Sequence, residues 1–440
     1  MSSISLLLRR AFSTSAAPSA VANYNNIMRH EADLKKVVET FKKYTQDSNF
    51  RKRASFYEHT VRRLSNTKNF TLIEEILEDQ KKYKDITDEG FTVRLITLYG
   101  KSGMFDHAHK LFDEMPELNC ERTVLSFNAL LGACVSSKNF DKVDGFLREL
   151  PVKLSIKPNV VSYNTVIKAL CEMGSFDSAF SLLDKMEKEG LKPDLISFNI
   201  LLNAFYKNSR FSDGERLWAM MEIHNVVPDI ISYNSKVYGL ILESRIQEAV
   251  DFVQEITSKG LKLDVYTYTI LFRGFCSDGK YLGEAKRWFD EMMKTKCPPN
   301  HLTFAILLRY ACKNNDFHFG SRLCRALFYR RCRLNEVGLL QKVVDGVVKQ
   351  KNIREAEEVL VQGSVPNVKS LSVITGIKVQ DRPFEDIQFK PKGSKNSSRT
   401  GFSQKNQRQT CLSGNQFVSS ASCMQILLRS MFKLLADLSV

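Results

Sequence analysis

Apolar residues recur at helical spacing through most of the chain, in short runs that Gly and Pro interrupt. The pattern is clearest in residues 160–194, where Gly174 separates two apolar stripes, and Gly190 and Pro193 end the second. The stripes consist of Val161, Val166, Ile167 and Leu170, then of Phe176, Ala179, Leu182, Leu183 and Met186. Each predicted helix is too short to be stable alone, so it must bury its stripe against a neighbour.

The same pattern of 35 residues returns in residues 195–229 and 230–264. Its aromatic marker recurs at a constant interval, as Tyr163, Phe198, Tyr233 and Tyr268. A fixed period of this length is typical of a repeat array in which each unit buries the apolar face of the next. The sequence therefore predicts an all-α fold, an α-solenoid superhelix of stacked helix-turn-helix repeats of about 35 residues.

The repeats begin with V-x-S/T-Y/F-N or a close variant such as LISFN or IISYN, have Gly or a small residue near their middle, and end with K-P-D/N or a close variant. This signature resembles pentatricopeptide repeats of the P class, specifically over Val124–Asn335 and more loosely on either side. The expected array is 54–365, with a capping helix at 31–53 before it. Its units are 54–88, 89–123, 124–159, 160–194, 195–229, 230–264, 265–300, 301–335 and a degenerate closing unit, 336–365.

Two of these units carry one extra residue, expected in the loop Leu150–Ser155 of unit 124–159 and near Tyr281–Glu284 of unit 265–300. Residues 366–440 have a different composition, and Lys390–Ser420 is rich in Ser, Lys, Gln, Asn and Gly. We expect a disordered basic tail there. Met424–Val440 has the pattern of an amphipathic helix, which leaves a docking segment open as the alternative.

The first 30 residues have the composition of a transit peptide, with Arg and Ser and no acidic residue before Glu31. Arg10–Ser13 resembles the R-x-F/Y-S processing site of mitochondrial precursors. We therefore expect a mitochondrial protein, with the chloroplast as the alternative. A secretory signal fits less well because the apolar run Ile4–Leu8 is short and precedes the Arg pair.

The formal net charge of +15 lies mainly at the ends of the chain. Residues 1–30 contribute +3 and residues 366–440 contribute +7, which leaves +5 for the array. RNA binding would therefore rest on a local surface rather than on bulk charge. Ten Cys residues form no C-x-x-C pair, and Cys171, Cys276 and Cys312 lie in apolar stripes, so we expect small buried side chains and no metal or disulfide framework.

The resemblance implies that each repeat contacts one RNA base through the fifth residue of its first helix and its own last residue. An Asn amide offers a donor and an acceptor to a Watson–Crick edge, and a nearby Asp can fix its orientation. The implied readers are Asn128 with Asn159 for a pyrimidine, Asn164 with Asp194, Asn199 with Asp229 and Asn234 with Asp264 for uracil, and Thr269 with Asn300 for adenine. Val161, Ile196, Ile231 and Tyr266 would enclose the bases, which gives pyrimidine-U-U-U-A from 5′ to 3′.

A structural interpretation of the same residues is that the Asn side chains satisfy local backbone groups and the Asp side chains cap helices. Capping alone would not require Asn and Asp to pair in the same three repeats, so base contact is favoured. Other repeats depart from the code, namely Ala305 with Asn335, Val93 with Thr123 and Glu58 with Asp88. The phosphate-binding Lys of the family appears only as Lys101, Lys207 and Lys313.

The leading hypothesis is a single-stranded RNA-binding protein that acts on mitochondrial mRNA in processing, stability or translation. The alternative is a structural subunit of the small mitochondrial ribosomal subunit, because Phe50–Arg53, Phe56, Tyr57 and Val61–Leu64 resemble a group of short ribosome-associated members of the family. A solvated charged face is the structural interpretation of that segment. A protein–protein scaffold explains the recurring Asn–Asp pairs less well.

We expect no enzymatic activity, catalytic residue or cofactor. The sequence has no deaminase H-x-E followed by C-x-x-C and no Asp cluster after the array. His107 and His109 are two residues apart on a predicted helix, so they point to different faces. They are expected to be surface histidines.

Overall fold

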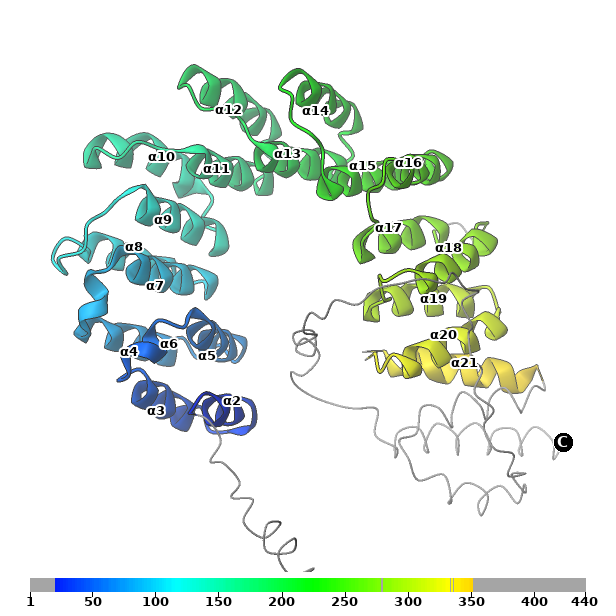
Figure 1. The fold of residues 1–440 in the computed structure, drawn as a ribbon, viewed down its shortest axis with the longest axis horizontal. Coiled ribbons are helices and arrows are strands. Elements are labelled where there is room, and N and C mark those ends of the chain that lie inside the picture. The colour runs from blue at the N-terminus through cyan, green and yellow to red at the C-terminus, as the bar shows by residue number, and fades with distance from the viewer. Residues whose placement is uncertain (1–19, 278–279, 333, 335, 351–440) are drawn as a thin grey trace, which may run out of the picture. The chain divides into compact units, whose positions relative to one another are not determined.

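The computed structural model describes residues 20–277, 280–332, 334 and 336–350, and every regular element in these ranges is a helix (Figure 1). Contacts divide the chain into two units, residues 1–239 and 240–440, with the boundary inside α15 (Ile230–Leu242). The N-terminal unit contains α2 (Ala20–His30), α3 (Leu34–Tyr44), α4 (Ser48–Arg51), α5 (Ala54–Asn66), α6 (Phe70–Glu78), α7 (Glu89–Lys101), α8 (Phe105–Glu114), α9 (Val124–Ser136), α10 (Asp141–Leu154), α11 (Val160–Glu172), α12 (Phe176–Lys188), α13 (Leu195–Lys207) and α14 (Phe211–Ile223). The C-terminal unit contains α16 (Ile246–Ser258), α17 (Val265–Phe275), α18 (Leu282–Lys294), α19 (His301–Lys313), α20 (Phe317–Tyr329) and α21 (Val337–Lys349).

In the N-terminal unit the first helices α7, α9, α11 and α13 pack successively against one another. The second helices α8, α10 and α12 each contact the first helix of their own repeat and the first helix of the next. Leu130, Ile167 and Leu202 are completely buried in this arrangement. Within the unit, stacked helix pairs therefore form the α-solenoid that the 35-residue period predicts.

The C-terminal unit repeats the arrangement with α17, α19 and α21 as its packed first helices. Helix α18 packs on α17, and α20 packs between α19 and α21. Ile270, Leu307 and Val343 are buried between these helices. The closing unit therefore contributes at least its first helix, while its remainder lies outside the described residues.

The start of several first helices is fixed by the last residue of the preceding repeat. Asn159, Asp194, Asp264 and Asn300 are N-caps, and each forms a reciprocal capping box with a hydroxyl residue three positions later. The partners are Ser162, Ser197, Thr267 and Thr303. Because the cap belongs to one repeat and the helix to the next, capping also fixes the register between neighbouring repeats.

Glycine is used where the backbone requires it. Gly174 and Gly190 have φ of 77°, at the turn after α11 and at the end of α12, where a side chain would be strained. Gly100 of α7 lies so close to α9 that an added Cβ would be 2.5 Å from the Ala133 Cα atom. The absence of a side chain at Gly100 therefore permits the close packing of α7 on α9.

The N-terminal boundary of the folded region differs from the boundary expected from composition. Helix α2 falls inside the segment 1–30 assigned to a transit peptide, yet the Tyr24 side chain is completely buried and contacts the rings of Tyr44, Phe50 and Phe56. The expected capping helix 31–53 is in fact two helices, α3 and α4, because Asp47 caps a new helix start. The Arg-rich residues 1–19 lie outside the described residues.

The extra residue of unit 124–159 is in a helix rather than in a loop. Helix α10 has 14 residues and includes Pro151, and Ser155 ends it with φ of 52°. In unit 265–300 the added length precedes α18, next to the undescribed residues 278–279. The tail 366–440 and its amphipathic segment lie outside the described residues. Among the residues that the structure describes, no helix is long and apolar enough to cross a membrane.

Candidate nucleic-acid interface

The side chains of Asn164 and Asp194 meet at the junction between two repeats. Asn164 is the fifth residue of α11, and its Nδ2 donates to Asp194 Oδ1 over 3.0 Å. Ser197, the third residue of α13, donates its hydroxyl to Asn164 Oδ1 over 2.6 Å and also bonds Asp194 Oδ1 over 2.9 Å. The predicted reader pair is therefore part of the capping box of the next helix.

Two further junctions of the N-terminal unit have the same geometry. In both, the Asn at the fifth position donates its Nδ2 to Oδ1 of the last residue of the repeat over 3.1 Å. The Ser hydroxyl of the following first helix donates to Oδ1 of that Asn, over 2.6 Å in one junction and 2.5 Å in the other. The residues are Asn128, Asn159 and Ser162, then Asn199, Asp229 and Ser232. The same network therefore caps the next helix and holds the Asn side chain in a pair, so helix capping and base contact are compatible roles for these residues.

These bonds leave part of each amide unused. An Asn side chain has two N–H donors and two acceptor lone pairs. At Asn164 one donor is directed to Asp194 and one lone pair accepts from Ser197, so one donor and one lone pair remain. The side chain is only 6% exposed, so the remaining groups are presented in a fixed orientation rather than on a mobile side chain.

The carboxylate at this junction is kept ionised. Partial burial would raise the pKa of Asp194, but hydrogen bonds from the Ser197 N–H, the Asn164 amide and the Ser197 hydroxyl outweigh it and hold the pKa below its ordinary value. An ionised carboxylate can only accept, so it selects the orientation in which Asn164 directs its N–H groups toward Asp194.

A row of exposed apolar side chains accompanies these pairs. Val161, Ile196 and Ile231 are the second residues of α11, α13 and α15, and they are 55%, 60% and 55% exposed. Tyr266 of α17, in the other unit, is 47% exposed. Leu125 of α9 holds the equivalent position and is 49% exposed, and it was not among the predicted residues although it lies three positions before Asn128. Exposed apolar groups beside polar readers suit the faces of a base.

The pairs of the C-terminal unit are built differently. Asp264 and Asn300 cap α17 and α19, in the way that the other last residues do. Thr269 is buried and donates its hydroxyl to Val265 O over 2.7 Å, and it lies 3.5 Å from the Thr303 hydroxyl. Thr269 and Asn300 therefore do not form a side-chain pair among the described residues. The adenine reader lacks the geometry seen at the Asn junctions.

The junction before α9, where the sequence departs from the code, is closed by a carboxylate. Glu89 Oε1 accepts from the Thr123 N–H over 2.9 Å and from the Ser126 N–H over 3.1 Å, and Thr123 Oγ1 donates to the same group. Despite the opposing effect of burial, these donors hold the pKa of Glu89 below its ordinary value. Val93, the fifth residue of α7, makes none of these hydrogen bonds. In the preceding repeat, Glu58 Oε1 lies 3.6 Å from Lys101 Nζ.

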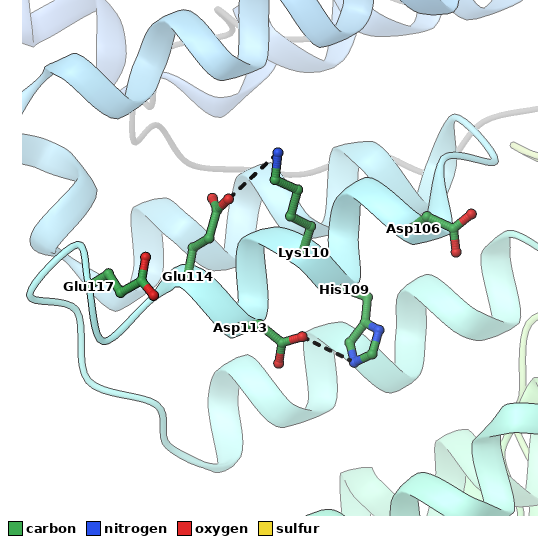
Figure 2. A pocket seen from close by; sticks show the side chains of 6 residues that line it. All are labelled: Asp106, His109, Lys110, Asp113, Glu114 and Glu117. Carbon is green, nitrogen blue, oxygen red and sulfur yellow. Dashed lines mark ion pairs between the residues drawn. The ribbon is translucent and has the colours of Figure 1, made fainter.

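Charge also distinguishes the two helix rows. Helices α9 and α11 carry no net charge, and α13, α15, α17 and α19 are net positive, with Lys207 and Lys313 exposed. Among the second helices, α8, α12, α14 and α16 are net negative, α10 and α18 carry no net charge, and α20 alone of these is net positive. The hollow on α8 shows this, since Asp106, Asp113, Glu114 and Glu117 line it with only His109 and Lys110 (Figure 2). The first-helix row is therefore the better surface for a polyanion.

The remaining candidate residues have structural surroundings. His107 stacks on Tyr99 and His109 on Phe105, so they face different neighbours as their spacing indicates. Cys171, Cys276 and Cys312 are half-buried rather than fully buried, because they lie at the ends of their helices. Burial raises the pKa of the Cys171 thiol to about 12, so it is unreactive. The described residues contain no cluster suited to a metal ion.

The hydroxyl residues Ser162, Ser197 and Ser232 were not predicted as part of the site, although they complete the junctions of Asn128, Asn164 and Asn199. Their signal is present in the sequence, since the third position of each first helix from α9 to α19 is Ser or Thr. The recurrence of this hydroxyl residue two residues before the Asn was the clue to its role.

The chain matches both family profiles and individual proteins. The profile of the PPR repeat family matches residues 94–145, 158–207 and 228–277, and a PPR repeat profile matches 196–226 and 266–297. Over 188 residues the chain is 53% identical to the small ribosomal subunit protein mS79 (rPPR3b) of Arabidopsis thaliana. That match covers 42% of this chain and 48% of the relative, so the alignment spans about half of the relative's length.

Two relatives align over most of their length. The small ribosomal subunit protein mL103 (rPPR7) of Arabidopsis thaliana is 30% identical over 81% of this chain and 89% of its own. A mitochondrial pentatricopeptide repeat-containing protein of the same plant is 30% identical over 79% and 82%. Among solved structures, the PPR10 protein from maize is 19% identical, with a TM-score of 0.45 over 84% of this chain and 61% of that chain.

Proposed function

The chain belongs to the pentatricopeptide repeat family, and from that premise we propose that it binds single-stranded RNA in mitochondria through its first-helix row. Each Asn junction takes one base. The Asn amide contacts the Watson–Crick edge of the base, and the exposed apolar residues on either side contact its faces. The protein has no chemistry of its own in this proposal and acts by occupying an RNA segment, which protects or exposes that segment.

The observation that carries the proposal is the partial saturation of the Asn amides. At three junctions the network uses one amide donor and one acceptor and leaves one of each. Uracil presents an N–H donor between two carbonyl acceptors, so it matches the pair of groups that remains. A network built only for capping could use Ser or Thr at the fifth position with less buried polar surface.

The preferred sequence is proposed as pyrimidine-U-U-U-A, with different support at its two ends. The pyrimidine and the first two uracils correspond to Asn128, Asn164 and Asn199, whose networks are alike. The third uracil is assigned to Asn234 with Asp264 by their place in the repeat. The adenine is assigned to Thr269, where the pairing is absent, so we expect the least discrimination there.

The test is a binding titration of the full chain with single-stranded RNA containing UUUA, against competitors in which each uracil is replaced by guanine. Asn199→Thr should shift the preference at one position from uracil toward guanine. Asn203→Thr is the matched control, because Asn203 lies one turn further along α13 and outside the junction network. Unchanged base preference in Asn199→Thr would contradict base reading at these junctions.

A second function is favoured by the relatives. The names of two of them, mS79 and mL103, describe small ribosomal subunit proteins, and one of these aligns over most of its length. We therefore propose a place on the mitochondrial ribosome as the alternative context, in which the same interface would meet ribosomal RNA. Sedimentation of tagged protein with the small ribosomal subunit distinguishes the two, since a messenger-bound protein would leave that fraction after ribonuclease treatment of mRNA.

A further inference from the structure

We propose that the end of α20, a second helix of the C-terminal unit, is an RNA-contact site separate from the Asn junctions. The site consists of Tyr329, Arg330 and Arg331, with Arg322 and Arg325 on the helix before them. Its ligand is the phosphate backbone of a single-stranded RNA segment, with one base stacked on the tyrosine ring. It extends the proposed function but does not depend on base reading by the Asn residues.

The first support is a reversal of charge. The second helices α8, α12, α14 and α16 are net negative, whereas α20 contains Arg322 and Arg325 and no acidic residue. The sequence has five Arg residues in positions 322–333 and no acidic residue between Asp316 and Glu336. No comparable acid-free basic run occurs at the end of another second helix of the array. A local concentration of this kind attracts a polyanion strongly at short range.

The second support is the exposure of an aromatic ring within this charge. Tyr329 is 87% exposed, the most exposed of the large apolar and aromatic side chains in the described residues. Arg331 is exposed, and Arg330 is half-buried with its Nε atom buried and without a hydrogen-bond partner. Neither forms an ion pair among the described residues, whereas Arg322 is paired with Asp290. An exposed aromatic ring beside guanidinium groups is the combination that single-stranded RNA surfaces use for stacking and phosphate contact.

The backbone at Arg331 offers a further way to test the site. This residue ends α20 with φ of 51°, and its N–H donates to Phe328 O while the next N–H donates to Leu327 O. The equivalent left-handed residues after α12, α14 and α16 are Gly190, Asn225 and Gly260, the types that adopt this conformation most easily. Arg331, like Lys68 and Lys138, adopts this conformation at some cost to stability, and a glycine would fit the same turn.

The test measures the binding of the full chain to a single-stranded RNA of about 20 nucleotides that lacks UUUA, at several salt concentrations. Arg330→Gln with Arg331→Gln should weaken binding roughly tenfold at 0.1 M salt and reduce the slope of log K against log salt by about 1.4, as expected for two lost phosphate contacts. Tyr329→Ala should weaken binding roughly fivefold with an unchanged slope, and Tyr329→Phe should restore it. Lys188→Gln with Lys192→Gln removes the same charge at the end of α12 and should change neither value.

Arg331→Gly separates the contact from the fold. Glycine suits φ of 51°, so the variant should unfold at the same temperature or about 2 °C higher while it loses RNA affinity. An unchanged salt slope in the double Arg variant would overturn the proposal. The proposal would also be overturned if the double Arg variant bound RNA as the original chain does but lost the binding of an acidic protein. Because the RNA lacks UUUA, a failure of base reading in Asn199→Thr leaves this outcome unaffected.

Discussion

The helices α2 to α7 and the helices α9 to α13 solve the same problem in two ways. Each must tie one layer of helices to the next with buried polar groups. In the first region ion pairs and backbone carbonyls take up four of the five N–H donors of Arg51, which bonds Asp85, Thr45 O and Gln46 O. In the second region each Asn junction keeps one donor and one acceptor unused.

The difference shows which buried polar network can also serve as a binding surface. The Arg51 guanidinium is 7% exposed and stacks on the Tyr83 ring with 4.2 Å to its centroid, so a ligand would have to displace internal partners. The solvated-face interpretation of the Arg-rich segment is wrong for Arg51 and Arg63, which bond Thr45 O and Met28 O and hold the N-terminal layers together. The resemblance of this segment to ribosome-associated members of the family does not depend on that interpretation. Lys52, Arg53 and Arg62 remain exposed.

The largest effect should follow from Arg51→Ala. The change leaves Asp85 and two carbonyl groups without their donor, and we expect a loss of about 3 kcal/mol in the free energy of unfolding. Chemical denaturation of the N-terminal unit checks this, and Lys52→Ala, at an exposed neighbour, should change stability by less than about 0.5 kcal/mol. Base preference should be unaffected. A change in the preferred base would mean that the two regions are not independent.

Ser197→Ala should have the next largest effect. It removes the donor to Asn164 and the reciprocal cap of Asp194 in one step, with an expected loss of about 2 kcal/mol. Ser126→Ala removes a bond to Thr123 O and the side-chain hydrogen bond to Glu89, and it should cost about 1 kcal/mol. Thermal unfolding measures both variants. If Ser197→Ala bound RNA with the discrimination of the original chain, the hydroxyl would not orient the amide.

The pH dependence should distinguish junctions closed by a carboxylate from the junction closed by Asn159. The folded-state pKa of Asp194 lies below its ordinary value of 3.8, so its contribution is complete above that value and is lost as pH falls through the lowered pKa. Asp194→Asn should cost about 1 kcal/mol at neutral pH, and the difference from the original chain should vanish in acid. Glu89→Gln should behave in the same way, beginning below 4.5. Urea unfolding between pH 2.5 and 7 provides the measurement.

The smallest effect on stability should follow from Val161→Ala, because the side chain is already 55% exposed. We expect a change within about 0.5 kcal/mol together with a severalfold loss of RNA affinity. Val152→Ala on α10 is the matched control, since Val152 is 82% exposed on a second helix. Equal RNA affinity for the two variants would remove the exposed apolar row from the interface.

The fold followed from the sequence because its information is local and repeated. The period, the caps and the Gly turns each act within a few residues, and the helix boundaries agree closely with them. The junction networks were only half predicted, because Asn164 and Ser197 are 33 residues apart and their contact depends on how the repeats stack. Tyr24 was missed for the same reason, since its burial depends on Phe50 and Phe56 rather than on its own segment.

The capping of each first helix by the preceding repeat has a consequence for redesign. The amide of Asn164 is oriented by Asp194 from its own repeat and by Ser197 from the following one. A module cut at the conventional boundary would therefore separate the reading side chain from one of the two groups that orient it. To transfer base specificity to another array, the exchanged segment should extend from the fifth residue of one repeat through the third residue of the next. The segment that determines base choice is therefore offset from the repeat that folds as a unit.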